Sequence, residues 1–247
     1  MVISNEHKYL FVEVPRTGST AIRNELVENY SGEIILHKHA TLSEFLRTAS
    51  KDEKDYFILS GRRNPLDRTV SEFLKYRNNH NDVLNRFSTR VKEFNWFTLK
   101  YHRANYFLRR VKFAQKESTT FENYYNKFFN KPYCDFGYYD HPRSNFVLSF
   151  EQLNQDFETA IEMLGIDLVR KLPQKNKTKN KNKVFWDYYD TAGLRRKAMK
   201  NTSIYYSISG YQFPDSWGNY KPSILDWVKF YFSNFPKMFY WKYFRNK

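Results

Sequence analysis

Residues 9–20 decide how this chain folds, and their sequence is Tyr9-Leu-Phe-Val-Glu-Val-Pro-Arg-Thr-Gly-Ser-Thr20. The apolar run Tyr9–Val14 is short and rich in aromatic and β-branched side chains, which predicts a buried β-strand. A helix is predicted next because apolar residues recur on one face at helical spacing, namely Ile22, Leu26 and Tyr30. We expect Ser19 to cap this helix and Gly32 to end it.

The turn between this strand and helix has the residue types of a phosphate cradle. Gly18 allows successive backbone N–H groups to converge, and a helix N-terminus adds partial positive charge. Hydroxyl groups and the cation of Arg16 complete the cradle. The turn is not a Walker A loop, because no Gly-Lys-Ser/Thr follows Gly18, and the Rossmann glycine pattern is also absent. An ordinary strand-to-helix turn with an arginine at its rim fits this local sequence equally well.

A second strand-to-helix turn, Gly61-Arg-Arg-Asn-Pro65, follows the apolar run Tyr56–Ser60. Pro65 is well suited to begin a helix, where its missing N–H has no cost. Ser71 then lies about one and a half turns into the helix and can face Arg63. An arginine fork and a hydroxyl that converge form a phosphate clamp. Two such turns at the carboxyl ends of neighbouring parallel strands would hold both ends of one ligand.

The remaining sequence alternates strand and helix patterns. Further strands are predicted at 33–36 and 145–149, and helices follow the capping box Thr41-Leu-Ser-Glu44 and span 85–130, 157–164 and 187–200. This alternation predicts an α/β fold with a P-loop-like parallel sheet flanked by helices. We expect a single domain over residues 1–214, followed by an aromatic and basic C-terminal extension over 215–247.

Composition narrows the class of protein. The chain has 247 residues, and 41 Lys and Arg against 26 Asp and Glu give 41 − 26 = +15. Hydrophobic residues make up 41%, which supplies a core and excludes a disordered basic tail. The single cysteine, Cys134, excludes an intramolecular disulfide and a Cys-based zinc module. No membrane-spanning run or secretory h-region is visible in the sequence, so we expect a cytoplasmic protein. The positive net charge predicts an anionic partner.

The two turns and the segments after them resemble those of sulfotransferases. Residues 15–20 are similar to the 5′-phosphosulfate loop of that family, and Arg63-Asn-Pro-Leu-Asp-Arg-Thr-Val-Ser71 is similar to its 3′-phosphate motif. The resemblance continues in order to about residue 214 and implies a sulfotransferase fold, most like that of the carbohydrate, glycan 2-O-type enzymes. One departure is Arg16, where carbohydrate sulfotransferases usually carry lysine. Tyrosylprotein sulfotransferases resemble this chain in having arginine there.

The resemblance implies transfer of a sulfuryl group from 3′-phosphoadenosine 5′-phosphosulfate (PAPS) to a hydroxyl by in-line displacement, with no metal. The residues implied to hold the 5′-phosphosulfate are Arg16, Thr17, Gly18, Ser19 and Thr20. Arg63 and Ser71 would hold the 3′-phosphate, and a loop at Lys177 and Thr178 would close over the nucleotide. A glycan is the expected acceptor. An acidic polysaccharide would explain the basic charge, although a protein tyrosine and a lipid headgroup stay open.

The segment His37-Lys-His39 is similar to the His-x-His segment of glycan 2-O-sulfotransferases, in which a histidine is the base. Imidazole titrates in the range needed to take a proton from an attacking hydroxyl. We expect His39 to be the base and His37 to position or assist it. Glu44 or Glu33 is the alternative base, and two partly exposed histidines without a catalytic role are the other alternative. The remaining histidines and Cys134 are expected to be surface or structural residues: His7, His80, His102 and His141.

The composition changes over residues 221–247, where ten of 27 side chains are aromatic, six are basic and one is acidic. Apolar residues recur there at helical spacing: Ile224, Trp227, Val228, Tyr231 and Phe235. One interpretation is a final helix packed on the domain. The other is an interfacial segment on an anionic membrane surface, with basic residues near the headgroups: Lys229, Lys237, Lys242, Arg245 and Lys247.

The competing function is a basic nucleic-acid-binding protein without catalytic activity. Its charge and abundant aromatic side chains would suit phosphate contacts and base stacking. However, no RRM, KH, homeodomain or zinc-finger pattern is present, and composition does not account for two phosphate turns. We therefore expect no nucleic-acid partner. A nucleotide or polyol kinase is disfavoured because the Walker lysine is missing.

Overall fold

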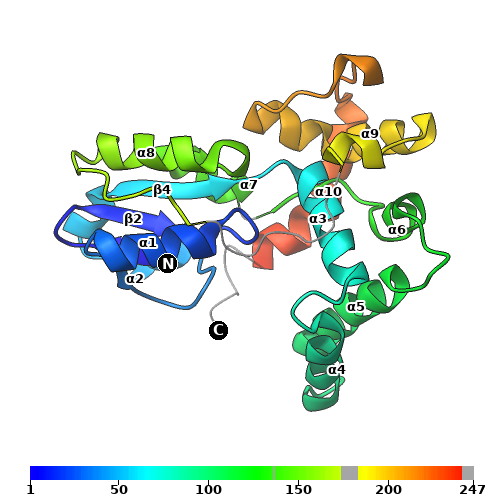
Figure 1. The fold of residues 1–247 in the computed structure, drawn as a ribbon, viewed down its shortest axis with the longest axis horizontal. Helices are drawn as coiled ribbons and strands as arrows, with labels where there is room; N and C mark the ends of the chain where they lie inside the picture. Colours follow the sequence, from blue (N-terminus) through cyan, green and yellow to red (C-terminus); the bar gives the residue numbers. More distant parts are fainter. Residues whose placement is uncertain (136, 174–182, 241–247) are drawn as a thin grey trace. The chain divides into compact units, whose positions relative to one another are not determined.

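The computed structural model describes residues 1–135, 137–173 and 183–240, and the chain divides into two compact units. The first unit comprises Met1–Asn64, Cys134–Asn176 and Tyr231–Lys247, and the second comprises Pro65–Tyr133 and Lys177–Phe230. Figure 1 shows the fold as a ribbon coloured along the sequence. The division predicted between residues 1–214 and 215–247 stays a prediction.

The first unit is built on a five-stranded sheet with the order β3-β1-β2-β4-β5. The strands are β1 (Val2–Ser4), β2 (Tyr9–Val12), β3 (Glu33–Ile34), β4 (Phe57–Arg62) and β5 (Phe146–Ser149). The pairs β2–β4 and β4–β5 are parallel, with Phe11 opposite Leu59 and Leu59 opposite Phe146. The carboxyl ends of these three strands therefore lie at one edge of the sheet.

Helices of the first unit cover both faces of β2. They are α1 (Ser19–Asn29), α2 (Leu42–Thr48) and α8 (Leu153–Met163), and α8 runs alongside the sheet in Figure 1. The short helix α7 (Gly137–Asp140) contacts β4. Tyr9 and Phe11 pack in one cluster with side chains of α1 and α8. Leu10 and Val12 pack in another with side chains of α2. A strand buried on both faces explains why its sequence is continuously apolar rather than alternating.

The predicted α/β class, with a sheet flanked by helices, is confirmed, but the sheet is mixed rather than fully parallel. Strand β1 was not predicted, and it pairs antiparallel with both β2 and β3. Only residues 5–8 connect β1 to β2, which is too short for the crossover that a parallel pair needs. The predicted strand at 33–36 is shortened to Glu33–Ile34 at the sheet edge.

The helix ends follow the sequence only in part. Ser19 does not cap α1; the N-cap is Gly18, with a positive φ of 80° and no side-chain cap hydrogen bond. Past the C-terminal end, the N–H of Gly32 donates to the carbonyl of Leu26 at 3.0 Å, as its predicted role at the helix end requires. The capping box of Thr41 and Glu44 at α2 is confirmed.

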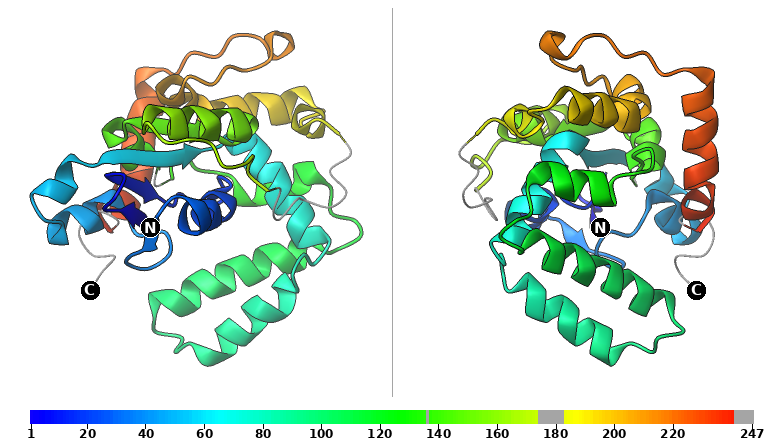
Figure 2. Two further views of the ribbon diagram at one scale, coloured as in Figure 1. Left: turned by 60° about the vertical axis from the view of Figure 1, so that its left-hand side comes forward. Right: turned by 90° about the vertical axis from the view of Figure 1, so that its right-hand side faces the viewer.

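The second unit is helical. Its helices are α3 (Pro65–Arg77), α4 (Val83–Glu93), α5 (Leu99–Ala114), α6 (Phe121–Phe128) and α9 (Ala192–Ser209), together with the first part of α10 (Ile224–Phe239). Figure 2 shows α4 and α5 side by side. The helical stretch predicted over 85–130 is therefore three helices. Helix α9 begins later than the predicted 187–200 because the side chain of Thr191 caps it, accepting from the N–H of Leu194 at 3.2 Å.

A buried arginine crosses the aromatic core of the second unit. Arg110 is 6% exposed, and its guanidinium forms an ion pair with Glu72. Its Nε donates to the hydroxyl of Tyr124 at 3.0 Å, and that hydroxyl donates to Glu72 Oε1 at 2.9 Å. Four ring centroids lie 4.7–5.5 Å from the guanidinium carbon, those of Tyr106, Tyr124, Phe128 and Phe129. The charges thus satisfy each other inside a mostly apolar environment.

Arg110→Ala should lower the free energy of unfolding by about 3–5 kcal/mol, because it leaves the carboxylate of Glu72 buried without its counter-charge. Arg109→Ala is the matched control, because Arg109 is the exposed neighbour on the same helix and its loss should change stability by less than about 0.5 kcal/mol. Urea unfolding of both variants measures the difference. Equal effects at the two positions would contradict a structural role for the buried pair.

Candidate active site

The turn predicted to bind the 5′-phosphosulfate, residues 15–18 and hereafter the first phosphate turn, joins β2 to α1 in the first unit. Arg16 and Gly18 both have positive φ, 69° and 80°, so the chain reverses within a few residues. A side chain at Gly18 would also be excluded by space, since a Cβ there would lie 2.5 Å from the side chain of Leu153. Backbone conformation and packing together therefore require glycine at this position.

The turn is seated on the neighbouring strand through Thr17 and Gly61. Thr17 is buried, and its hydroxyl donates to the carbonyl of Val14 at 2.9 Å. A Cβ added to Gly61 of β4 would lie 2.5 Å from Thr17 Oγ1 and 3.0 Å from Thr17 Cβ. Only a glycine in β4 lets the turn approach this closely. In this structure the Thr17 hydroxyl thus supports the turn.

The second turn adjoins the first through Arg63. The Arg63 guanidinium is buried, lies 3.9 Å from the ring centroid of Phe150, and donates to the carbonyl of Arg16 at 3.3 Å. The N–H of Asn64 donates to Glu151 Oε1 at 2.7 Å, which ties this turn to the chain after β5. The structure thus brings the two turns, which were predicted separately, into contact at the carboxyl ends of β2 and β4.

The structure does not relate the other predicted donor residues to these turns. Ser71 is buried on α3 in the second unit, whereas Arg63 belongs to the first, so their predicted clamp stays a prediction. Lys177 and Thr178 lie outside the described residues, and the predicted closing loop is likewise untested.

His39 lies against the start of the first turn. Its Nδ1 is 2.8 Å from the carbonyl oxygen of Glu13, and its backbone has a positive φ of 64°. Because a carbonyl oxygen only accepts, Nδ1 must be the protonated nitrogen, and in the neutral ring Nε2 then carries the lone pair. Lys38 Nζ donates to Thr20 Oγ1 at 3.4 Å. The His37–His39 segment therefore runs along the phosphate turn.

The alternative bases have other surroundings. Glu44 is buried, and its carboxylate accepts from the N–H of Thr41 in the capping box of α2. His37 is largely exposed, and its Nε2 lies 3.6 Å from Glu44 Oε1. Glu33 is exposed on the edge strand β3, where it pairs with Ile3. Glu44 thus already serves a helix N-terminus, whereas His39 lies beside the first turn.

A comparison with protein families decides the assignment. The model of the sulfotransferase family matches residues 1–208. The chain belongs to the sulfotransferase family. No curated protein and no solved structure matches it. The match spans both phosphate turns and the histidine segment, and it favours an enzyme over the nucleic-acid-binding alternative.

Membership makes this chain a sulfotransferase, an enzyme that transfers a sulfuryl group from a sulfate donor to a hydroxyl acceptor. Among the described residues, no group of three or more His, Cys, Asp and Glu side chains is arranged to hold a metal ion. None of the helices described is long and apolar enough to cross a membrane. The glycan 2-O subgroup is not distinguished by the family match.

His141, expected to be a surface or structural residue, contacts strand β4 of this sulfotransferase near its carboxyl end. The His141 side chain is partly buried, and its Nε2 lies 3.1 Å from the carbonyl oxygen of Gly61, while burial lowers the pKa of its ring. Beside it, Asp140 Oδ1 accepts from the N–H of Leu42 at 3.4 Å. No local motif reveals these contacts, because their partners lie far away in the sequence. Cys134 is structural as expected, and burial raises the pKa of its thiol to about 12.

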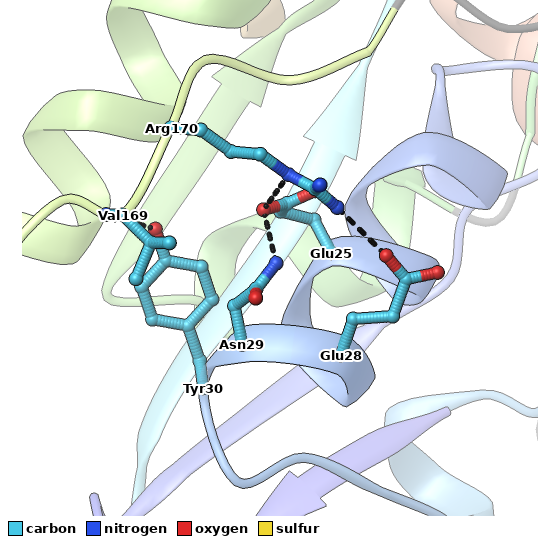
Figure 3. Close-up of polar contacts among 6 residues, drawn as sticks. All are labelled: Glu25, Glu28, Asn29, Tyr30, Val169 and Arg170. Carbon is cyan, nitrogen blue, oxygen red and sulfur yellow. Dashed lines mark hydrogen bonds and ion pairs between the residues drawn. The ribbon is translucent and has the colours of Figure 1, made fainter.

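An ion-pair cluster fixes the chain that precedes the predicted nucleotide loop (Figure 3). The guanidinium of Arg170 donates to the carboxylate of Glu25 at 3.0–3.1 Å and to Glu28 at 2.7 Å. The N–H of Val169 donates to the hydroxyl of Tyr30 at 3.0 Å. Glu25 is fully buried, so it holds the half-exposed arginine in place. The segment after α8 is thereby attached to α1, the helix that starts at the first phosphate turn.

Gly61→Ala should destabilise the sulfotransferase by about 1–3 kcal/mol, because the new methyl group overpacks against Thr17. Gly193→Ala in α9 is the matched control, because a Cβ there meets no atom within 4 Å. That change should stabilise the chain by about 0.5–1 kcal/mol through reduced backbone entropy. Denaturant unfolding gives both values, and a Gly61→Ala variant as stable as the wild type would show that the turn is not seated on β4.

Proposed function

We propose that this sulfotransferase transfers the sulfuryl group of PAPS to a hydroxyl of an acidic glycan, with His39 as the base. The observation that carries the proposal is the hydrogen bond from His39 Nδ1 to the carbonyl of Glu13, two residues before the first phosphate turn. It orients an imidazole beside the place where the sulfuryl group would be held.

The donor would bind across the two turns. Arg16 and the backbone of residues 17–20 would hold the 5′-phosphosulfate at the N-terminus of α1, where the helix dipole favours an anion. Arg63 would meet the 3′-phosphate, with Ser71 completing the clamp and Lys177 and Thr178 closing over the nucleotide. Stacking on Phe150 and the bond to Arg16 support Arg63 as a pre-organised cation, because its side chain is ordered before the ligand arrives.

The reaction would be a direct in-line displacement. The acceptor oxygen forms a bond to sulfur while the bond from sulfur to the bridging phosphate oxygen breaks. His39 Nε2 takes the proton of the acceptor hydroxyl, and the cation of Arg16 stabilises the charge that grows on the leaving phosphate. Holding donor and acceptor in line supplies much of the rate enhancement in such transfers. His37 would position or assist His39.

The acceptor proposal is supported by charge. A formal net charge of +15 favours an anionic substrate, and a glycan related to those of the 2-O-sulfotransferases fits it. We also propose that the enzyme is peripheral to an anionic membrane surface, through the aromatic and basic residues 215–247. This placement would suit a glycan carried on a lipid.

Arg63→Ala should weaken binding of 3′,5′-ADP by roughly tenfold to a hundredfold, because a charge-assisted hydrogen bond to phosphate is worth ~1.5–3 kcal/mol. Ser71→Ala should weaken it in the same direction. Arg47→Ala removes an exposed arginine from α2 and serves as the charge-matched control, with unchanged affinity. Calorimetric titration is the measurement. Wild-type affinity in both the Arg63 and Ser71 variants would rule out the assigned 3′-phosphate site.

His39→Ala should lower the turnover rate by ~10²–10⁴ while nucleotide affinity stays within a few-fold, as expected for a positioned base. The wild-type rate should also fall at acidic pH, since a protonated imidazole has no lone pair to take the proton. Glu44→Gln is the control, because an amide keeps a cap hydrogen bond and loses basicity. Normal turnover of His39→Ala with an inactive Glu44→Gln variant would identify the carboxylate as the base instead.

A further inference from the structure

Helix α10 has two buried polar residues on one side, and most of its large apolar residues are exposed. Asp226 and Asn234 are buried, together with Phe230. The exposed side chains are Ile224, Leu225, Val228, Tyr231, Phe232, Phe235 and Phe239, and Phe232 reaches 85% exposure. A helix that simply packs on its domain has the opposite arrangement, with apolar residues inward.

The seven exposed residues, hereafter the outer stripe, form one continuous face. At ~100° per residue they fall within an arc of about 120° centred on Val228. The buried residues Asp226, Phe230 and Asn234 follow each other at four-residue spacing on the opposite side. Figure 2 shows α10 as the orange-to-red helix. Helix α10 therefore has separate apolar and polar sides, as an interfacial amphipathic helix has. In α10, however, the side with Asp226 and Asn234 is buried in the protein.

Specific polar contacts on the inner side fix this orientation. Within the second unit, Asp226 Oδ2 accepts from the hydroxyl of Tyr220 at 2.9 Å and from the N–H and hydroxyl of Ser223 at 3.0 and 2.8 Å. Within the first unit, the ammonium of Lys237 donates to the carbonyl of Cys134. These contacts hold the helix by its polar side, so rotation of the outer stripe inward would break them.

Basic residues accompany the outer stripe. Lys229 is exposed on its flank, and Lys221 is exposed just before the helix. The sequence after the helix adds Lys242, Arg245 and Lys247, and Asp226, which is turned inward, is the only acidic residue of 221–247. An exposed aromatic and aliphatic face with cations and without exposed carboxylates complements an anionic lipid surface.

We propose that the outer stripe of α10 inserts into the headgroup region of an anionic bilayer, with Phe232 and Phe235 as its principal anchors. The inference rests on the membrane placement proposed above and gives it a defined face. A second copy of the chain fits the same face less well, because a symmetric contact through the stripe would bring Lys229 of one molecule toward like charges of the other.

The test is sedimentation of the full chain with vesicles of phosphatidylcholine containing phosphatidylserine. Phe232→Ser and Phe235→Ser should each weaken binding roughly tenfold, and vesicles of phosphatidylcholine alone should bind the wild type at least tenfold more weakly. Phe97→Ser is the matched control, since Phe97 is 74% exposed and lies in a second apolar patch between α4 and α5. That variant should bind vesicles as the wild type does.

Because the substituted side chains point outward, all three variants should keep wild-type unfolding curves and wild-type affinity for 3′,5′-ADP. The proposal would be overturned if the wild-type chain did not sediment with phosphatidylserine vesicles, or if it bound vesicles of phosphatidylcholine alone equally well. Vesicle binding by the Phe232→Ser and Phe235→Ser variants at wild-type strength would also overturn it, as would a Phe97→Ser variant that binds as weakly as they do. Self-association of the chain without lipid, abolished by the Phe232→Ser and Phe235→Ser changes, would point to a second copy of the chain as the occupant instead. Loss of nucleotide binding with vesicle binding intact would instead count against the donor site.

Discussion

The close approach of Thr17 to Gly61 is the constraint on which the rest of the site depends. It joins the turn after β2 to the neighbouring parallel strand, and a Cβ on Gly61 would leave only 2.5 Å to Thr17 Oγ1. Because the turn packs on β4, the carbonyl of Arg16 accepts a hydrogen bond from Arg63, the residue that follows β4. The same turn begins α1, whose C-terminal half holds Arg170 through Glu25. A local packing requirement thus sets the geometry of residues far apart in the sequence.

The structure gathers the residues proposed to bind phosphate and to take a proton at one edge of the sheet. The turn after β2 offers backbone and a cation, and the turn after β4 offers a stacked arginine. His39 Nδ1 forms a hydrogen bond with the carbonyl of Glu13, two residues before the first turn. His141 reaches the same edge from the segment before β5 by contacting Gly61. Such convergence at the carboxyl ends of parallel strands is where ligands bind in α/β folds, and it agrees with the sulfotransferase family assignment.

Local sequence patterns were sufficient for the elements with strong periodicity or defined turn chemistry. The buried strand at 9–12, the capping box at Thr41 and both strand-to-helix turns could be predicted because each leaves its signal within a few residues. Strand β1 could not be predicted, because three residues are too few to show a hydrophobic period. Its pairing with β3 joins segments that are far apart in the sequence. The contacts of His141 and Arg170 were also unpredictable, because their partners are brought near only by the tertiary fold. The orientation of α10 could not be predicted for a related reason. Helical spacing identifies an apolar face, but it does not show whether that face points toward the protein or toward solvent.

The most direct test of the account is the affinity of the full chain for 3′,5′-ADP compared with 5′-AMP, measured by calorimetry at one salt concentration. Two turns that hold both ends of a bisphosphate predict saturable one-to-one binding of 3′,5′-ADP, at least roughly tenfold tighter than 5′-AMP, since the 3′-phosphate adds a charge-assisted contact. A DNA oligonucleotide should not displace it. Equal affinity for the two nucleotides, or displacement by the oligonucleotide, would mean that the turns carry only general positive charge and would contradict the assigned donor site.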